Sequence, residues 1–271
     1  PSYRPTDGLV AWYPFNGNAN DESGNGNNGV VNGSVSLTTD RNGNQNAAYS
    51  FPGSSSAFIN VNQNATFSNF SGGFTLSVWY LSNPTSSTGR IVALGNTDAC
   101  IVGFDAKGFS STGIVITTNC SAQLGEWGNA VSNQNPAVWY NLILTANFAN
   151  NKWNIYHNGI EVLSGTSTSS ISTPLNLSGY PFNIGRKSVG AFDPWNGKID
   201  DIGIWNRALT PQEVTALYQG KNTSIQANII QSDTAICKGN SIKLELSQSV
   251  LKPDTVLIES FSMNMLAPFN H

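Results

Sequence analysis

Short runs of apolar residues, many of them alternating with polar ones, recur between Gly, Asn and Ser clusters along residues 8–205. Examples are "GLVAWYPF", "FTLSVWYLS", "VWYNLILTANF" and "KIDDIGIW". Runs of this length and alternation are typical of β-strands, and the frequent Asn-Gly pairs tolerate the positive φ angles that tight turns need. The pattern therefore predicts an all-β protein, either a sandwich or a jelly roll.

One segment departs from this pattern, at residues 209–220 ("LTPQEVTALYQG"). Thr210 is a suitable N-cap, Pro211 suits the first helical position, and Glu213 completes a capping box. Gly220 follows as a stop signal. The segment predicts one short helix at the C-terminal end of the β domain.

The predicted helix is followed by a polar stretch, "KNTSIQAN", and then by a new strand pattern, "NIIQSDTAICKGNSIKLEL". This change predicts a first domain over residues 1–222, followed by a linker and a short β appendage over residues 223–271. The appendage is too short for an ordinary independent β domain. It is either the start of a second module or a segment that adds strands to a partner.

Composition narrows the class of protein. Charged residues make up 11% of the 271 residues, the formal net charge is -3, and no run of like charges occurs. A nucleic-acid partner or an anionic membrane surface is therefore not expected. No apolar run approaches the roughly 18 residues of a membrane span, and the polar start "PSYRPTDG" does not resemble a signal peptide. Abundant Asn, Ser, Thr and Gly favour a secreted or cell-surface location.

Three cysteines bear on the compartment. Cys100 and Cys120 bracket two strand-like runs, "CIVGFDAKG" and "GIVITTNC", whose ends would lie side by side in an antiparallel pair. We expect a disulfide there, worth roughly 3 kcal/mol in the chain-entropy model, with two free buried thiols as the alternative. Cys237 has no evident partner, and two histidines without any CxxC pair make a zinc site unexpected.

Several motifs stand in a characteristic order: "GLVAWYPFNGNANDESGNGNNG", "TTDRNGNQNAAYSFPG", "FTLSVWY", "NIYHNGIEV" and "NGKIDDIGIWNRALTPQEVTALY". With them, residues 8 to about 220 closely resemble laminin-G-like, concanavalin A-like jelly-roll domains of secreted multidomain proteins of Bacteroidetes-type bacteria. The resemblance implies a concanavalin A-like jelly-roll β-sandwich with the short helix at its end. The stretch "SDTAICKGNSIKLEL" resembles the opening strands of immunoglobulin-like repeats, which implies a partial immunoglobulin-like module after the jelly roll.

The loop "NANDESGNGNNG", residues 18–29, has the chemistry of a calcium cradle. Calcium takes six to eight oxygen ligands, and Gly and Asn allow a loop to turn several of them toward one point. Asp21 would contribute a carboxylate, whereas Glu22 is expected to face solvent. A second carboxylate must come from elsewhere in the chain.

The strand "KIDDIGIW" supplies the candidates for that second carboxylate. Strict alternation places Asp200 on the face of Ile202 and Ile204, where an acid is costly unless it is paired, and makes Asp201 the solvent-facing one. The resemblance to the family likewise implies calcium between Asp21 and Asp200, with Asn27 completing the shell. The alternative is that Asp21 forms an Asx-turn and Asp200 pairs with a buried Arg or with backbone amides.

The sequence does not predict an enzyme. Glycosidases of this kind of fold place paired carboxylates in a groove, often as acids that alternate along one strand, and no such arrangement occurs. Asp200 and Asp201 are expected to point to opposite faces of their strand. No nucleophile-elbow pattern is present, and the two histidines lie before an Asn-Gly turn and at the C-terminus.

Binding is then the expected activity. Most tryptophans lie within strand patterns and are expected in the core, whereas Trp127, Tyr180, Phe192 and Asp193 lie in loop-like segments that suit a ligand-binding rim. For each of these four, packing that anchors a loop is the alternative. The expected ligand is a polysaccharide or cell-surface glycan, with other domains of the same surface assembly as further partners.

Three functions fit these features. The first is a non-catalytic, extracellular carbohydrate-binding or adhesion module with a structural calcium ion. The second is a structural spacer or protein-interaction domain of a cell-surface adhesin or filament. The third is an accessory domain of a glycoside hydrolase.

Overall fold

The computed structural model covers most of the predicted β domain. The chain divides into a first unit, Pro1–Asn222, and a second, Thr223–His271. The described residues belong to the first unit, so the predicted immunoglobulin-like module lies outside them and stays a prediction. Among the described residues no helix is long and apolar enough to cross a membrane. The structure describes residues 3–61, 64–83, 88–95, 103–109, 113–119, 122–124, 135, 137–166, 177–178, 182–187 and 193–221.

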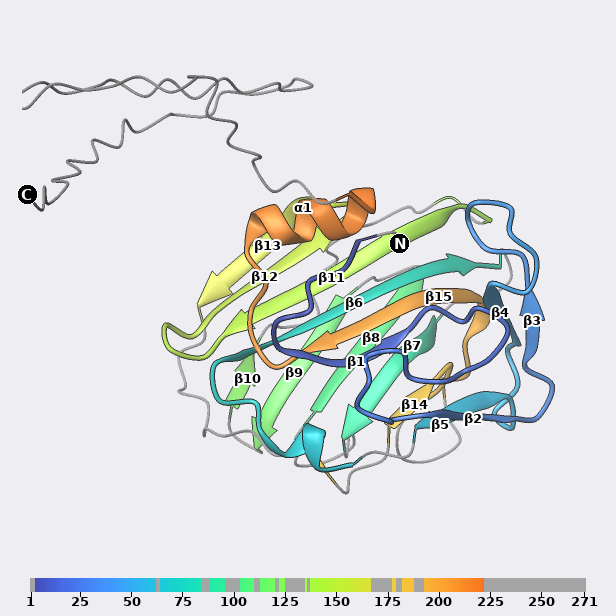
Figure 1. Ribbon diagram of the computed structural model, residues 1–271, viewed down its shortest axis with the longest axis horizontal. Coiled ribbons are helices and arrows are strands. Elements are labelled where there is room, and N and C mark those ends of the chain that lie inside the picture. Colours follow the sequence, from blue (N-terminus) through green and yellow to red (C-terminus); the bar gives the residue numbers. More distant parts are fainter. Residues whose placement is uncertain are drawn as a thin grey trace, which may run out of the picture. The chain divides into compact units, whose positions relative to one another are not determined.

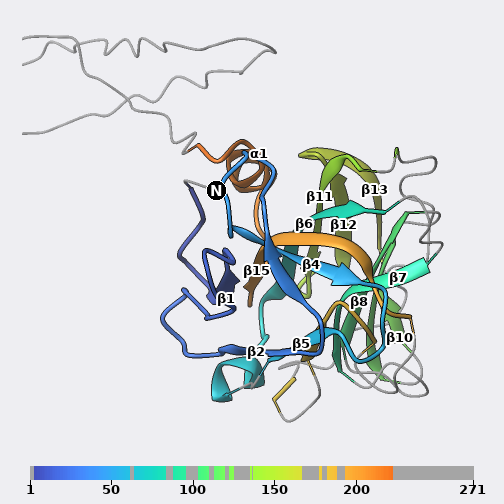
Figure 2. The same cartoon turned by 90° about the vertical axis from the view of Figure 1, so that its right-hand side faces the viewer.

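Two antiparallel sheets form the predicted sandwich (Figures 1 and 2). The larger sheet has eight strands, in the order β13-β12-β11-β6-β15-β4-β3, with β1 pairing β15 beside this path. Their bounds are β1 Leu9–Tyr13, β3 Ser36–Thr38, β4 Ala48–Pro52, β6 Gly73–Ser82, β11 Trp139–Asn147, β12 Lys152–His157, β13 Ile160–Thr166 and β15 Asn196–Trp205.

The smaller sheet has seven strands, in the order β10-β9-β8-β7-β14-β5-β2, and β8 and β9 are seen behind β6 in Figure 1. A 3-10 helix, η1 (Ala65–Ser68), and one α-helix, α1 (Pro211–Gln219), complete the described elements. The predicted fold class, an all-β jelly-roll sandwich with one short helix, is confirmed. The bounds of the strands in the smaller sheet are β2 Gly29–Asn32, β5 Phe58–Val61, β7 Thr88–Gly95, β8 Gly103–Phe109, β9 Gly113–Asn119, β10 Ala122–Leu124 and β14 Phe182–Ile184.

The central strand β6 shows how alternation builds the core. Phe74, Leu76, Val78 and Tyr80 are buried and belong to the main apolar cluster between the sheets. Each fully buried apolar side chain of this size stabilises the fold by roughly 1.5–3 kcal/mol. The intervening positions point to the other side of the larger sheet, called the outer face below. Trp79 lies there, stacked on Tyr218 of α1 with ring centroids 5.5 Å apart.

A second apolar cluster covers part of this outer face. It joins four strands, β1, β11, β12 and β15, to the helix, because α1 places its apolar side on the sheet. The tryptophans of β1 and β15 are therefore core residues, as predicted, although they face away from the main core. The members are Trp12, Ile143, Tyr156, Trp205, Leu209, Val214 and Leu217.

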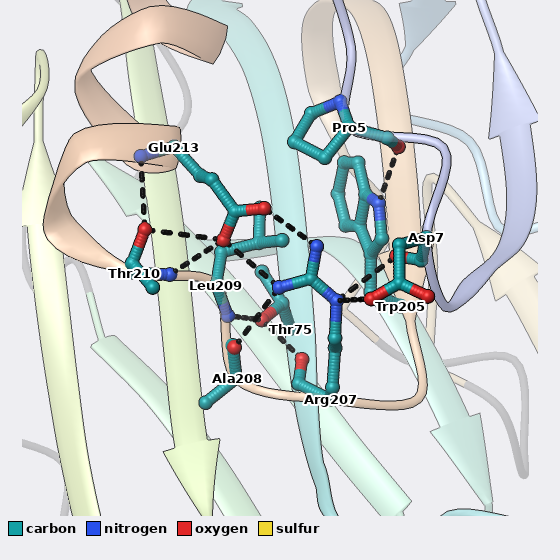
Figure 3. Close-up of polar contacts among 9 residues, drawn as sticks. All are labelled: Pro5, Asp7, Thr75, Trp205, Arg207, Ala208, Leu209, Thr210 and Glu213. Carbon is teal, nitrogen blue, oxygen red and sulfur yellow. Dashed lines mark hydrogen bonds and ion pairs between the residues drawn. The ribbon is translucent and has the colours of Figure 1, made fainter. Parts of the chain in front are cut away.

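The start of α1 has the predicted capping box (Figure 3). The Thr210 hydroxyl accepts the Glu213 backbone N–H at 3.2 Å, and the Glu213 carboxylate accepts the Thr210 N–H at 2.9 Å. The same carboxylate forms two bonds with Arg207, at 2.6 and 2.8 Å, and Arg207 reaches Asp7 at 2.9 Å. The helix ends at Gly220, whose φ of 64° is left-handed. The helix, the end of β15 and the N-terminal segment are thus bonded together.

Candidate functional site

A pocket of about 270 Å³ lies where the N-terminal segment, the turn over residues 39–47 and β15 meet. These segments carry the first, second and last of the motifs in the sequence, so distant parts of the chain form one site. Its walls are almost wholly polar, with four carboxylates, three side-chain amides and one guanidinium. The lining residues are Arg4, Trp12, Pro14, Asn16, Glu22, Asp40, Asn42, Asn44, Ala47, Asp200 and Asp201.

A bulge in β15 brings two adjacent acids to this site. Asp200 is opposite Trp79 and Gly203 is opposite Ser77, so Asp201 and Ile202 together face the single residue between those partners on β6. Asp201 has a φ of 43°, in the left-handed region. The extra residue shifts the alternation by one position, and both acids come to the outer face while Ile202 stays in the main core.

Two predictions about these acids are therefore wrong. Asp201 is not solvent-facing, because it is only 4% exposed, and Asp200 does not share a face with Ile202 and Ile204. Strict alternation would have separated Asp200 from Asp201, but the bulge interrupts it. The alternative, in which Asp200 pairs with a buried Arg or with backbone amides, is closer to the contacts: Asp200 pairs with the partly buried Arg41 and accepts one backbone N–H.

Arg41 is the partner of both acids. Its Nη1 lies 2.6 Å from Oδ2 of Asp200 and 2.6 Å from Oδ2 of Asp201, and the Asp201 backbone N–H donates to Oδ1 of Asp200 at 2.8 Å. Burial, and then the neighbouring Asp201 carboxylate, raises the pKa of Asp200 to about 8, although Arg41 and the amide act against this shift. The guanidinium also lies over the Trp79 ring, 4.3 Å from its centroid.

The turn that carries Arg41 is ordered by the preceding acid. Oδ1 of Asp40 accepts the backbone N–H groups of Asn42 and Asn44, both at 2.8 Å, and Oδ2 accepts the Asn44 side-chain amide at 2.9 Å. Burial alone would raise the pKa of Asp40, but the hydrogen bonds from Asn44 and Asn42 lower it. The exposed amides of Asn42 and Asn44 are thereby held at the pocket wall.

Asp21 organises the N-terminal loop through its backbone. Its Oδ1 accepts the N–H groups of Trp12 and Ser23, and its Oδ2 accepts that of Asn27, all at 2.9 Å. The loop lines the pocket through Glu22, which is exposed as predicted, and not through Asp21. Asp21 therefore acts as an Asx-turn residue with an additional long-range contact to β1.

Asn27 is fully buried and its side chain is satisfied by protein groups. Its oxygen accepts the Asn64 backbone N–H at 3.1 Å, and its amide donates to the Val10 carbonyl at 3.1 Å and to the Thr66 hydroxyl at 3.0 Å. Hydrogen bonds or an ion pair thus engage all three predicted calcium ligands, Asp200 included. The described part of the chain contains no group of three or more His, Cys, Asp or Glu that could hold a metal ion. This donor set does not fit the predicted calcium ion.

Of the four predicted rim residues, the structure describes Asp193. Asp193, with a φ of 53°, accepts the Arg90 backbone N–H at 2.9 Å through its carbonyl, and its carboxylate is 3.5 Å from the Arg90 guanidinium. It does not line the pocket. Trp127, Tyr180 and Phe192 lie outside the described residues, as do both members of the predicted disulfide, Cys100 and Cys120.

Arg41 and Asp40 were not identified from the sequence as site residues. Both stand in the motif "TTDRNGNQN", where an acid followed by Asn and Gly is typical of a turn. Residue 41 is 159 positions from Asp200 in the chain, so no local pattern pairs them. One signal was available in the sequence. A buried acid in β15 needs a positively charged partner, and the chain contains only 13 Lys and Arg residues from which to choose it.

Comparison with known proteins identifies relatives of the domain. A family model described as the concanavalin A-like lectin/glucanases superfamily matches residues 52–215. No curated protein matches the chain. Domain 4 of AbnA, a GH43 extracellular arabinanase from Geobacillus stearothermophilus in complex with arabinotriose, is 22% identical with a TM-score of 0.59, over 78% of this chain and 98% of that domain.

Clostridial toxin domains are also similar in structure. The receptor-binding domain of a botulinum neurotoxin C/D mosaic serotype is 15% identical with a TM-score of 0.62, over 84% of this chain and 54% of that one. Botulinum neurotoxin type C, whose cell entry is described as dependent on two ganglioside molecules, is 14% identical with a TM-score of 0.60, over 82% and 53%. The chain thus spans about half of each toxin structure, and at these identities the likeness concerns the fold.

Proposed function

The chain belongs to the concanavalin A-like lectin/glucanases superfamily, and we propose that its jelly-roll domain is a non-catalytic carbohydrate-binding module that works outside the cell. The observation that carries the proposal is the polar pocket. Carboxylates accept hydrogen bonds and side-chain amides both donate and accept them, so together they can read the hydroxyl groups of a sugar. A site built in this way discriminates strongly against ligands that lack the matching hydroxyls.

The acids of the pocket favour binding over catalysis. Asp200 and Asp201 are both held by one guanidinium nitrogen, and the Asp40 oxygens accept hydrogen bonds from its own turn. A glycosidase needs one carboxyl group free to give its proton and a second free to attack or to activate water. Of the four acids that line the pocket, the exposed Glu22 is the one whose carboxylate has neither an ion pair nor a hydrogen bond of this kind.

The similar structures guide the choice of ligands for a test. One is described with arabinotriose and another as dependent on gangliosides. We therefore propose oligosaccharides as ligands, with the setting being either a cell surface or a position beside a catalytic domain. The predicted loop residues Trp127, Tyr180 and Phe192 remain a second proposed contact region, and secretion remains a proposal supported by the extracellular arabinanase relative.

The test is binding of the full chain to a panel of immobilised glycans that includes arabinan oligosaccharides and gangliosides. Asn42→Ala removes one exposed amide of the pocket without removing the backbone N–H that Asp40 accepts. Asn20→Ala is the matched control, because Asn20 is also exposed but does not line the pocket. We expect Asn42→Ala to weaken retention about tenfold, the effect of losing one good hydrogen bond to a ligand, and Asn20→Ala to leave it unchanged.

Other outcomes separate the alternatives. If Trp127→Ala weakens binding and Asn42→Ala does not, glycans bind at the predicted loop and the pocket is not the site. If no glycan retains the wild-type chain, carbohydrate binding is refuted, and the structural spacer of a surface assembly becomes the better proposal.

A further inference from the structure

We propose that Arg41 is the resident cation of this fold, and that its guanidinium takes the structural role for which the sequence predicts a calcium ion. In this view the domain neither needs nor binds calcium between its N-terminal loop and β15. The inference concerns the stability of the domain and does not depend on the proposed glycan binding.

The first support is the position of the guanidinium. Its Nη1 is within 2.6 Å of a carboxylate oxygen of both Asp200 and Asp201, whose side chains are 2% and 6% exposed. Two buried carboxylates this close together need a compensating positive charge. A guanidinium group supplies that charge and can contact both acids from one nitrogen.

The second support is the state of the other predicted ligands. The oxygens of Asp21 receive three backbone N–H groups, and the side-chain oxygen of Asn27 receives the Asn64 N–H. Calcium would need several of these side-chain oxygens to point at one position. Each oxygen that moved there would leave a backbone N–H group without its hydrogen-bond acceptor. A divalent cation at Asp200 would also lie next to the positive charge of Arg41, which repels it.

The third support is that Arg41 makes the connection that a structural ion would make. It reaches from the 39–47 turn to β15 through the two acids, and its guanidinium lies over Trp79 of β6. Trp79 in turn stacks on Tyr218 of α1, with only 12° between the ring planes. A turn near the N-terminus, two central strands and the C-terminal helix are thereby joined without an ion.

The first experiment measures the thermal midpoint of the full chain with excess calcium and with chelator. A ligand that binds only the folded state raises the midpoint in proportion to the logarithm of its concentration. We expect the two midpoints to agree within about 1 °C. A midpoint that rises with calcium in the wild type but not in Asp21→Asn or Asp200→Asn would overturn the proposal.

The second experiment is a double-mutant cycle between the cation and one acid. Arg41→Gln leaves two buried carboxylates without their cation, and we expect the midpoint to fall by roughly 10 °C. Measured above pH 8, where Asp200 is ionised, Arg41→Gln combined with Asp200→Asn removes one of the two charges, and we expect it to recover at least half of that loss. Arg4→Gln is the matched control, since Arg4 lines the same pocket but pairs with no buried acid there: it makes a 3.5 Å contact with the Glu22 carbonyl and lies 5.7 Å from the centroid of the Trp12 ring.

These results decide the proposal even if Arg41→Gln does not fold. A double variant that folds when the single variant does not is the strongest form of the expected rescue. Equal loss in the single and double variants, or a loss in Arg4→Gln as large as in Arg41→Gln, would show that charge neutralisation is not the role of Arg41. Arg41→Lys, which keeps the charge but loses the planar contact with Trp79, should fall between the wild type and Arg41→Gln.

Discussion

Thr75 offers the sharpest test of how the end of the sandwich is held. This residue of β6 is fully buried, and its hydroxyl lies between two backbone groups of the segment that leads into α1 (Figure 3). It donates to the Arg207 carbonyl at 2.7 Å and accepts the Leu209 N–H at 2.9 Å. Thr75→Val keeps the shape of the side chain but replaces the hydroxyl with a methyl group, so both backbone groups lose their partner.

The magnitude follows from these two contacts. A buried polar group left without a hydrogen bond costs about 1–3 kcal/mol, and here one carbonyl and one N–H are affected. The added methyl group recovers a part of this, on the order of 0.8 kcal/mol for one buried carbon. We therefore expect Thr75→Val to lower the free energy of unfolding by about 3 kcal/mol. Thr75→Ser keeps the hydroxyl and loses one methyl group, so its expected loss is about 1 kcal/mol.

Urea unfolding followed by tryptophan fluorescence measures both variants. A loss of 3 kcal/mol corresponds to a midpoint lower by about 1 M urea, with an unchanged dependence on denaturant. The order of the two variants is the decisive result. If Thr75→Ser is less stable than Thr75→Val, or if Thr75→Val equals the wild type, packing of the methyl group and not the hydroxyl holds this segment, and the reasoning is refuted.

Three further changes test other parts of the fold. Because the folded-state pKa of Asp200, about 8, exceeds its unfolded value of about 3.9, the wild type should lose stability as the pH rises through this interval. The midpoint of Asp200→Asn relative to the wild type should therefore rise from pH 5 to pH 8, and a constant difference would contradict the shift. Gly197→Ala should cost about 3 kcal/mol in urea unfolding, because φ is +153° and a Cβ would lie 2.1 Å from the Leu81 carbonyl oxygen; wild-type stability would contradict this. Thr210→Ala should cost about 1 kcal/mol by removing the cap of α1, and we expect Thr210→Ser to restore it.

The parts of the fold that depend on local chemistry could be predicted from the sequence. The helix over 209–220 was recognisable because its cap, its first-turn proline and its terminal glycine all lie within a few residues of one another, and α1 has all three. The strands followed from alternation and turn residues. The jelly-roll arrangement of those strands followed from the order of motifs that the chain shares with its family.

The bulge at Asp200 could not be predicted in this way. It arises because two residues of β15 oppose one residue of β6, and this mismatch is a property of the strand pair. Alternation read along β15 alone therefore placed its two acids on opposite faces. The ion pair between Arg41 and Asp200 could not be predicted either, because it also depends on a contact between distant segments, here 159 residues apart.

The contacts that hold the acids of the pocket also prepare it for a ligand. A binding site loses affinity whenever its side chains must be ordered by the ligand, at about 0.5–1.5 kcal/mol for each flexible side chain. Here the Asp40 turn is held by its own hydrogen bonds, and Asp200 and Asp201 are held by Arg41, before any ligand is present. The stability of the outer face and the proposed recognition of sugars therefore depend on one set of interactions. This explains why a domain with few charged residues places several of them together at this point.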